Sequence, residues 1–151
     1  RMGNDTPEQK QQRKTRYELI AKQLPLLQKA GVNIIAGSDA AALNTFVYPA
    51  ASLIEELTLF QKAGMRPIDI LRTATINGAK FWGIENKTGS IEAGKAADLV
   101  LLDKNPLRSI YAVEKINSVI VKGKYLDRTT LDNMLGEVKN VKKALDNRSK
   151  K

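Results

Sequence analysis

The apolar residues of this chain follow two patterns, one typical of helices and one typical of short strands. Over residues 17–27 the apolar side chains fall at helical spacing, Pro25 predicts a kink or a new helix start, and Ala30-Gly31 predicts the end of that helix. Residues 32–36 are mostly apolar and are typical of a short strand buried on both faces, as in a parallel sheet. This expected strand leads directly into Gly37-Ser38-Asp39.

Helical patterns follow the expected strand. They predict a helix over residues 51–63 that Gly64 ends, a further helix that Pro67 begins, and a short helix over 76–82 with Thr75 as its cap. A single buried strand between helices cannot form a sheet by itself, because it needs neighbours to pair with. We therefore expect the first half of the chain to be a slice of a larger α/β domain.

After Gly83 the apolar pattern changes from helical spacing to short runs typical of strands. Residues 99–102 are typical of a strand, and residues 119–121 and 125–126 predict a β-hairpin. Thr129 or Thr130 is the expected cap of a final helix in which Gly136 is a weak point. The apolar positions of this helix form one stripe: Leu131, Met134, Leu135, Val138, Val141 and Leu145.

The composition argues against several classes of protein. The chain has no cysteine, which excludes a disulfide framework, and its apolar runs are too short for a membrane span. It also has no histidine, so a self-contained zinc hydrolase or Ser-His-Asp hydrolase is hard to build from it. The net charge of +9 gathers in residues 1–30 and 136–151, where solvated helices explain it, and the interleaved aromatics that nucleic-acid stacking needs are missing.

Asp39 is the candidate catalytic and metal-binding residue. It follows the expected strand, and in (β/α) barrels the loops at the carboxyl ends of the strands carry the active site. A carboxylate there can bind a divalent metal or accept a proton from a metal-bound water. Taken alone, an aspartate after Gly-Ser is more often a turn or helix-cap residue. Glu55 and Glu56 are the next carboxylates, and one of them is expected to face solvent.

A series of motifs in one order extends over about residues 24–126. Its main pieces are Ala-Gly-Val-Asn-Ile-Ile-Ala-Gly-Ser-Asp-Ala at 30–40, Lys-Ala-Gly-Met-Arg-Pro at 62–67, Ala-Thr-Ile-Asn-Gly-Ala-Lys at 74–80 and Gly-Ser-Ile-Glu-Ala-Gly-Lys-Ala-Ala-Asp-Leu-Val-Leu-Leu-Asp at 89–103. This series resembles the amidohydrolases, in the branch that contains imidazolonepropionase and Xaa-Pro dipeptidases. Two departures stand out, because many relatives carry a histidine where Ile54 stands, and the family's metal-binding histidines have no counterpart in this chain.

The resemblance implies an α/β fold, namely the C-terminal portion of a metal-dependent hydrolase with a (β/α)₈ barrel and an appended β-sandwich. On this interpretation residues 1–83 hold the final barrel helices and the last barrel strand at 32–36. Residues 84–126 supply sandwich strands with the hairpin, and residues 127–151 form an amphipathic helix with a basic tail. The aspartate after the final barrel strand ligates metal and transfers a proton in this family, and Asp39 is the matching residue.

The expected function is therefore metal-dependent hydrolysis of a C–N bond in an amide or cyclic amide, within a longer protein. The resemblance implies a divalent metal, with zinc the expected ion, and a small or peptide-like amide substrate. We expect the isolated chain to be inactive, to bind no metal tightly, and to associate with the upstream part of its own protein or with further copies of itself. The alternative is a non-catalytic binding or scaffold module that uses its basic terminal helices on an acidic partner.

Overall fold

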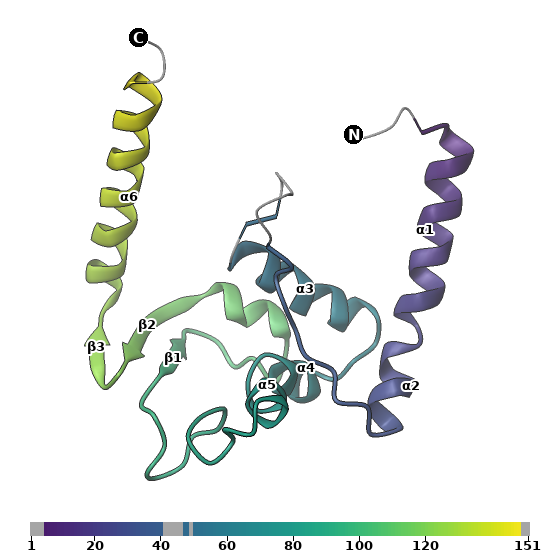
Figure 1. Ribbon diagram of the computed structural model, residues 1–151, viewed down its shortest axis with the longest axis horizontal. Helices are drawn as coiled ribbons and strands as arrows, with labels where there is room; N and C mark the ends of the chain where they lie inside the picture. The colour runs from purple at the N-terminus through teal and green to yellow at the C-terminus, as the bar shows by residue number, and fades with distance from the viewer. Residues whose placement is uncertain (1–4, 41–46, 49, 149–151) are drawn as a thin grey trace.

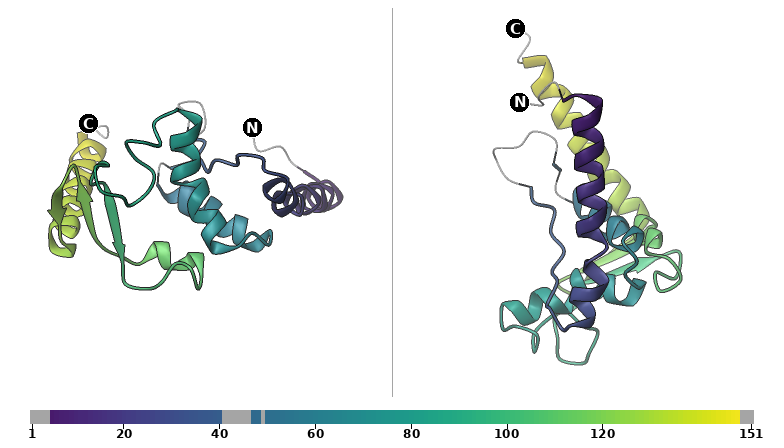
Figure 2. Two further views of the ribbon diagram at one scale, coloured as in Figure 1. Left: turned by 90° about the horizontal axis from the view of Figure 1, so that it is seen from below. Right: turned by 90° about the vertical axis from the view of Figure 1, so that its right-hand side faces the viewer.

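The computed structural model describes residues 5–40, 47–48 and 50–148 as a mixed α/β chain with two projecting helices (Figure 1). Its helices are α1 (Pro7–Ala21), α2 (Leu24–Lys29), α3 (Ala51–Lys62), α4 (Pro67–Thr73), α5 (Ile76–Phe81), the 3₁₀ helix η1 (Ile110–Glu114) and α6 (Arg128–Arg148). The strands are β1 (Leu99–Leu102), β2 (Ile116–Val121) and β3 (Lys124–Leu126). Seen from below, the sheet and α6 lie at one end and α1 at the other (Figure 2).

The first helices begin and end where local chemistry dictates. Thr6 and Gln9 form a capping box, in which the Thr6 hydroxyl accepts from the Gln9 N–H and the Gln9 side chain accepts from the Thr6 N–H. Pro25 lies in the first turn of α2, so it restarts the helix as predicted. Gly31 ends the pair with a φ of 82°, a conformation that glycine adopts without steric cost.

The core forms where α3, α4 and η1 meet. Its buried members are Leu57, Phe60, Met65, Ile70 and Ile110. Ile110 is fully buried, and its N–H donates to Gln61 Oε1 at 2.7 Å, so the side chain of one helix binds the backbone of another. Because Ile110 and the α3 side chains share this core, the segments on the two sides of residue 83 pack as one body. The predicted division of the chain at that residue stays a prediction.

The three strands form one antiparallel sheet in the order β1-β2-β3. The predicted hairpin is confirmed, with Val121 paired to Lys124 across a two-residue turn. Lys122 and Gly123 both have positive φ, 51° and 79°, as in the turns whose twist suits a two-residue hairpin. Asp98, the residue before β1, supports this turn, since its Oδ1 accepts from the Lys122 N–H at 2.6 Å. A second sheet of a sandwich is not found among the described residues.

Residues 32–36 are not a strand in this structure, contrary to the prediction. They form an extended segment, which we call the strap (residues 32–39), held to α4 and α5 and not to any strand. Ala36 N donates to Thr73 O at 3.0 Å, and Asn77 Nδ2 donates to Ile34 O at 2.8 Å. The physical reason is that a parallel strand needs hydrogen-bonding neighbours, and the described part of the chain places none beside it.

The final helix departs from expectation at its start. Asp127 caps α6, because its Oδ1 accepts from the Thr130 N–H at 2.7 Å; neither Thr129 nor Thr130 is the cap. Hydrogen bonds from the side chain of Thr130 and from its backbone N–H hold the pKa of Asp127 below its ordinary value. The helix runs unbroken through Gly136. Within the described ranges, no helix combines the length and the apolarity needed to cross a bilayer.

Candidate functional site

The strap carries Asp39 to the edge of the body. Ile34 and Ala36 face inward and pack against the core, whereas Ile35 between them is 40% exposed. This alternation is that of a strand with only one face covered. The strap ends at Asp39, close to the last described residue before the break at 41–46 (Figure 1).

Glu56 on α3 holds the backbone that precedes Asp39. The N–H of Gly37 donates to Glu56 Oε2 at 2.5 Å, which ties the end of the strap to the middle of the helix. The contact needs Glu56 half-buried, and this burial raises the pKa of its carboxyl group. The hydrogen bond from Gly37 opposes that rise, and the negative charge of Asp39 adds to it.

Asp39 itself is exposed and has a backbone φ of 48°. Aspartate tolerates this left-handed region better than most residues, because its short polar side chain can bond locally. Within the described ranges, neither a hydrogen bond nor an ion pair engages its carboxylate. The structure thus presents a carboxylate at the end of the strap, near the carboxylate of Glu56, with its oxygens available to a ligand from outside the described residues.

The described residues do not complete a metal site. In that part of the chain, no three histidine, cysteine or acidic side chains gather where an ion could bind them together. Asp39 and Glu56 supply two carboxylates, and one oxygen of Glu56 already accepts from Gly37. Oxygen ligands suit a divalent cation, but such a site needs more than two protein ligands to hold one firmly.

The sequence did not predict the contact between Glu56 and the strap. Glu55 is exposed, as expected for one of the pair, while Glu56 turns inward toward Gly37. The sequence signal is the position of Glu56 next to buried Leu57, on the helix face that meets the core. Ile54 is half-buried on the same helix, and its apolar side chain cannot make the polar contact that a histidine there would make.

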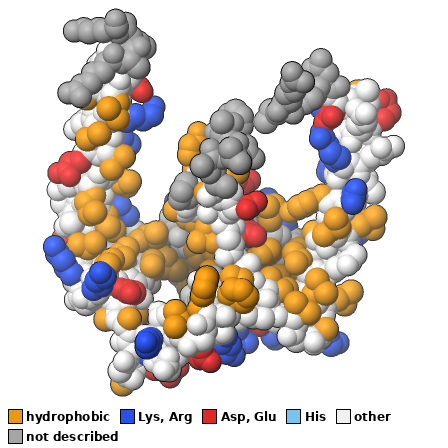
Figure 3. Space-filling view, viewed as in Figure 1, with side chains coloured by type: hydrophobic (Ala, Val, Ile, Leu, Met, Phe, Trp, Pro, Cys, Tyr) orange, Lys and Arg blue, Asp and Glu red, His pale blue; other side chains and the backbone are white. Residues whose placement is uncertain are grey.

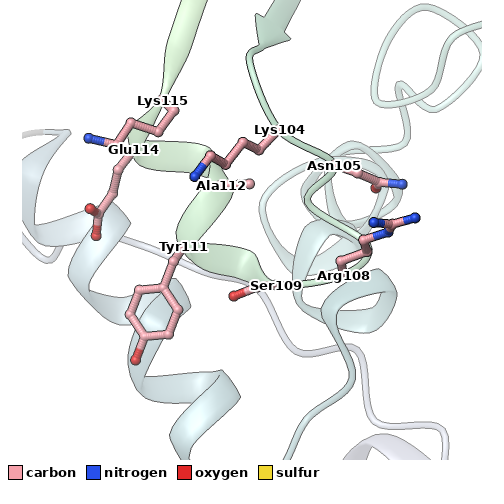
Figure 4. Close-up of a pocket in the computed structure, with 8 residues that line it drawn as sticks. All are labelled: Lys104, Asn105, Arg108, Ser109, Tyr111, Ala112, Glu114 and Lys115. Carbon is pink, nitrogen blue, oxygen red and sulfur yellow. The ribbon is translucent and has the colours of Figure 1, made fainter.

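A separate hollow of about 550 Å³ lies around η1, away from the strap. Its lining includes Lys104, Arg108 and Lys115 against a single acid, Glu114. Figure 4 shows Arg108 and Glu114 on opposite sides of the hollow, with the Tyr111 ring directed away from both. The polar groups therefore do not converge on one point, as a binding site for a small ligand requires.

Comparison with known proteins agrees with the geometry. Residues 17–126 match the model of the amidohydrolase family. The chain is 38% identical over 86 residues to the 5-methylthioadenosine/S-adenosylhomocysteine deaminase of Teredinibacter turnerae, which covers 54% of this chain and 20% of the relative. It is 34% identical over 105 residues to the imidazolonepropionase of Thermoplasma volcanium, covering 66% of this chain and 25% of the relative.

A solved structure shows the same arrangement of elements. The crystal structure of a Xaa-Pro dipeptidase with bound methionine in its active site aligns with a TM-score of 0.61 and 31% identity, over 72% of this chain and 25% of that one. Both members of the branch expected from the sequence motifs, imidazolonepropionase and Xaa-Pro dipeptidase, are thus among the similar proteins, and the chain spans about a quarter of their length. The matched region is well over half of the chain, and the chain therefore belongs to the amidohydrolase family.

Proposed function

We propose that this chain is the part of a longer metal-dependent amidohydrolase that carries the catalytic carboxylate, Asp39, for hydrolysis of a C–N bond. The observation that carries the proposal is an exposed aspartate, free of hydrogen bonds to the described residues, at the end of the strap. Deaminases and dipeptidases, the relatives named above, both hydrolyse bonds between carbon and nitrogen. That shared reaction supports the general class and leaves the substrate of this protein open.

The role of Asp39 is to move one proton. As a water oxygen forms its bond to the substrate carbon, Asp39 accepts the proton that the water loses. As the C–N bond then breaks, Asp39 returns that proton to the departing nitrogen. A divalent ion, when bound, lowers the pKa of the attacking water. Asp39 would be one of its ligands, and the others would come from outside the described residues.

Glu56 acts here as a positioning residue. It contacts neither substrate nor water in this scheme, but its carboxylate accepts the Gly37 N–H two residues before Asp39. A carboxylate that must meet a water and a leaving nitrogen in turn tolerates little displacement. Fixing the backbone before Asp39 to α3 limits that displacement.

The decisive experiment is Asp39→Asn in the longer protein that contains this chain. Asparagine also tolerates positive φ, so the substitution removes the charge without straining the backbone. We expect kcat to fall by about a thousandfold, within the range for loss of a general base. Glu55→Gln is the matched control on the exposed face of α3 and should leave kcat unchanged. Near-normal kcat in the metal-loaded Asp39→Asn enzyme would contradict the proposal.

The positioning role of Glu56 has its own test in the same enzyme. Glu56→Gln keeps an oxygen that can accept the Gly37 N–H, whereas Glu56→Ala does not. We expect Glu56→Ala to lower kcat by about tenfold with little change in KM, and Glu56→Gln to restore most of it. Equal loss in both variants would show that the charge of Glu56, and not its hydrogen bond, is what matters.

A separate prediction concerns metal binding by the isolated chain. With two carboxylates in reach, it should bind zinc no more tightly than a weak surface site does. Isothermal titration of the chain with zinc, beside the Asp39→Asn variant, measures this. Stoichiometric binding tighter than micromolar that Asp39→Asn abolishes would mean that the chain completes its own site.

A further inference from the structure

Helix α6 carries an apolar stripe that the rest of the described chain leaves uncovered. Leu131 is half-buried at the base of the helix, and beyond it the stripe is open, with exposures of 51% to 66% at Met134, Val138, Val141 and Leu145. Figure 3 shows hydrophobic side chains along the length of this arm. Such a row of apolar side chains on a projecting helix marks an interaction surface.

The spacing of the stripe is that of a coiled coil. Leu131, Val138 and Leu145 occupy a positions of a heptad, and Met134 and Val141 occupy d positions, so that the steps alternate between three and four residues. Apart from Gly136, the opposite face carries only polar side chains. Its c positions are all asparagine, at 133, 140 and 147.

The helix lies outside the part of the chain that the family shares. The family match ends at residue 126, and α6 begins at Arg128. Its tie to the body is near its first turn, where Arg128 Nη1 donates to Ile116 O at 3.0 Å. The rest of α6 projects away from the body (Figure 1). The residues that match the family model therefore do not cover the stripe.

We propose that a second copy of this chain covers it, with the two α6 helices forming a parallel two-stranded coiled coil. Charge complementarity selects this occupant and this orientation. Glu137 is a g residue and Lys142 is the e residue of the next heptad, the two positions that meet across a parallel pair. Each dimer thus gains two Glu137–Lys142 contacts, one on each side of the seam.

An antiparallel pair would lose these contacts. There, g positions face g positions, and the other g residues of α6 are Thr130 and Ala144, so Glu137 would meet no lysine. Within one helix Lys142 lies 3.4 Å from Asp146, an exposed pair that contributes little and leaves the lysine able to turn to a partner. Because the stripe covers only two and a half heptads, we expect a dimer of micromolar affinity.

Sedimentation equilibrium of the chain tests the interface. The double substitution Val138→Asp/Val141→Asp places charges in the seam and should abolish the dimer. Asn133→Asp/Asn140→Asp adds the same charge on the opposite face of the same helix and should leave the dimer intact. If the two variants and the parent have the same mass, whether monomer or larger assembly, the proposal is wrong.

Charge exchange tests the orientation. Glu137→Lys alone and Lys142→Glu alone each create like-charge contacts and should weaken self-association about tenfold at low salt. Mixed together, the two variants restore both opposite-charge contacts in a parallel heterodimer, so the mixture should associate as tightly as the parent. A mixture no tighter than either variant alone would overturn the parallel arrangement.

Cross-linking gives an independent measure, since the chain has no cysteine of its own. Under mild oxidation Leu145→Cys, at an a position far from the base, should form a disulfide-linked dimer in good yield. Asn147→Cys, at a c position nearby, should not. Equal yields would contradict the coiled coil. A monomeric chain that binds phosphatidylserine vesicles, and stops binding on Val138→Asp/Val141→Asp, would assign the stripe to a membrane surface instead.

Discussion

The strap and strand β2 have similar sequences and different structures. Both are short apolar runs, Val-Asn-Ile-Ile-Ala at 32–36 and Ile-Asn-Ser-Val-Ile-Val at 116–121. β2 has a hydrogen-bonded strand on each side, β1 and β3, and forms the centre of the sheet. The strap has none in the described structure and is held by isolated bonds to Thr73, Asn77 and Glu56. An apolar run becomes a strand only where a neighbour supplies its hydrogen bonds.

The backbones of β2 and of the strap are also held in place in two different ways. β2 is fixed by repeated backbone bonds within the chain, so its order depends on elements that are all present. The strap packs on the core through Ile34 and Ala36, and on its other face Ile35 is 40% exposed. A barrel in the longer protein would cover that face and bring neighbouring strands to it, which fits the proposed role of Asp39 at its end.

The largest effect is expected at the residue on which both regions depend. Ile110 is fully buried and contacts the α3 and α4 side chains against which the strap packs. Ile110→Ala should lower the free energy of unfolding by about 2–4 kcal/mol, through lost burial and an unfilled cavity. Ile91→Ala, at a site 85% exposed, is the matched control and should change it by less than about 0.5 kcal/mol.

Urea unfolding followed by two signals checks this prediction. Far-ultraviolet circular dichroism reports the helices and the sheet, and the fluorescence of Trp82 reports the end of α5. If the core is shared, both signals should shift together to lower urea in Ile110→Ala. A shift in one signal alone would mean that the strap side and the sheet side unfold separately.

The next largest effect on stability is expected at Asp69 on α4, the helix against which the strap packs, and it depends on pH. Asp69 is buried on α4, where the guanidinium of Arg66 at 2.6 Å and that of Arg72 at 3.3 Å surround its carboxylate. The hydrogen bond from Arg66 is the main cause that holds the pKa of Asp69 below its ordinary value, against the opposing effect of burial. Asp69→Asn should cost about 1–3 kcal/mol at neutral pH, as for loss of a charged hydrogen bond.

The sign of the pH dependence follows from that lowered pKa. The folded state holds the Asp69 charge more strongly than the unfolded chain does, so the contribution is complete above the ordinary aspartate pKa and is lost as the pH falls through the lower, folded value. The gap in stability between the parent and Asp69→Asn should therefore be constant near neutrality and shrink below about pH 4. Asp132→Asn, in an exposed pair with Arg128, should show a gap below about 0.5 kcal/mol at every pH.

Local signals made most of the helices and the hairpin predictable. Pro67, Gly64 and Gly31 act on their own neighbours, so the bounds of α4, α3 and α2 followed from residues close in sequence. The turn at Lys122-Gly123 was found for the same reason. The cap of α6 was misplaced because Asp127, Thr129 and Thr130 are all good caps, and only the backbone geometry decides among them.

The features that sequence reasoning missed depend on residues far apart. Glu56 and Gly37 are nineteen positions apart, and the contact between them needs α3 to cross the end of the strap. The pairing of Asp69 could be suspected from Arg66 and Arg72 at helical spacing, but its burial depends on the whole core. The strap was predicted as a strand because its pattern was read without its partners.

A smaller effect separates the strap from the sheet directly. Asn77→Ala removes the side-chain bond to Ile34 O and should cost about 1 kcal/mol, felt mainly by the strap. Hydrogen exchange at the Ala36 amide, which donates to Thr73 O, should become about fivefold faster, while the β2 amides are unchanged. Asn117→Ala removes a side-chain bond to Asp103 beside the sheet and should leave the Ala36 amide unaffected. Faster exchange of Ala36 in both variants would mean that the two regions are not independent.

The smallest effect should strengthen the sheet while leaving the strap alone. Lys122 has a φ of 51° in a two-residue turn, and asparagine is favoured there because it tolerates positive φ better than lysine. Lys122→Asn should therefore raise the free energy of unfolding by about 0.5 kcal/mol. Lys124→Asn removes the same charge at a strand position, where asparagine is disfavoured, and should lower stability slightly. If both variants gain stability equally, relief of positive charge is the cause, and the turn geometry of β2 and β3 contributes nothing.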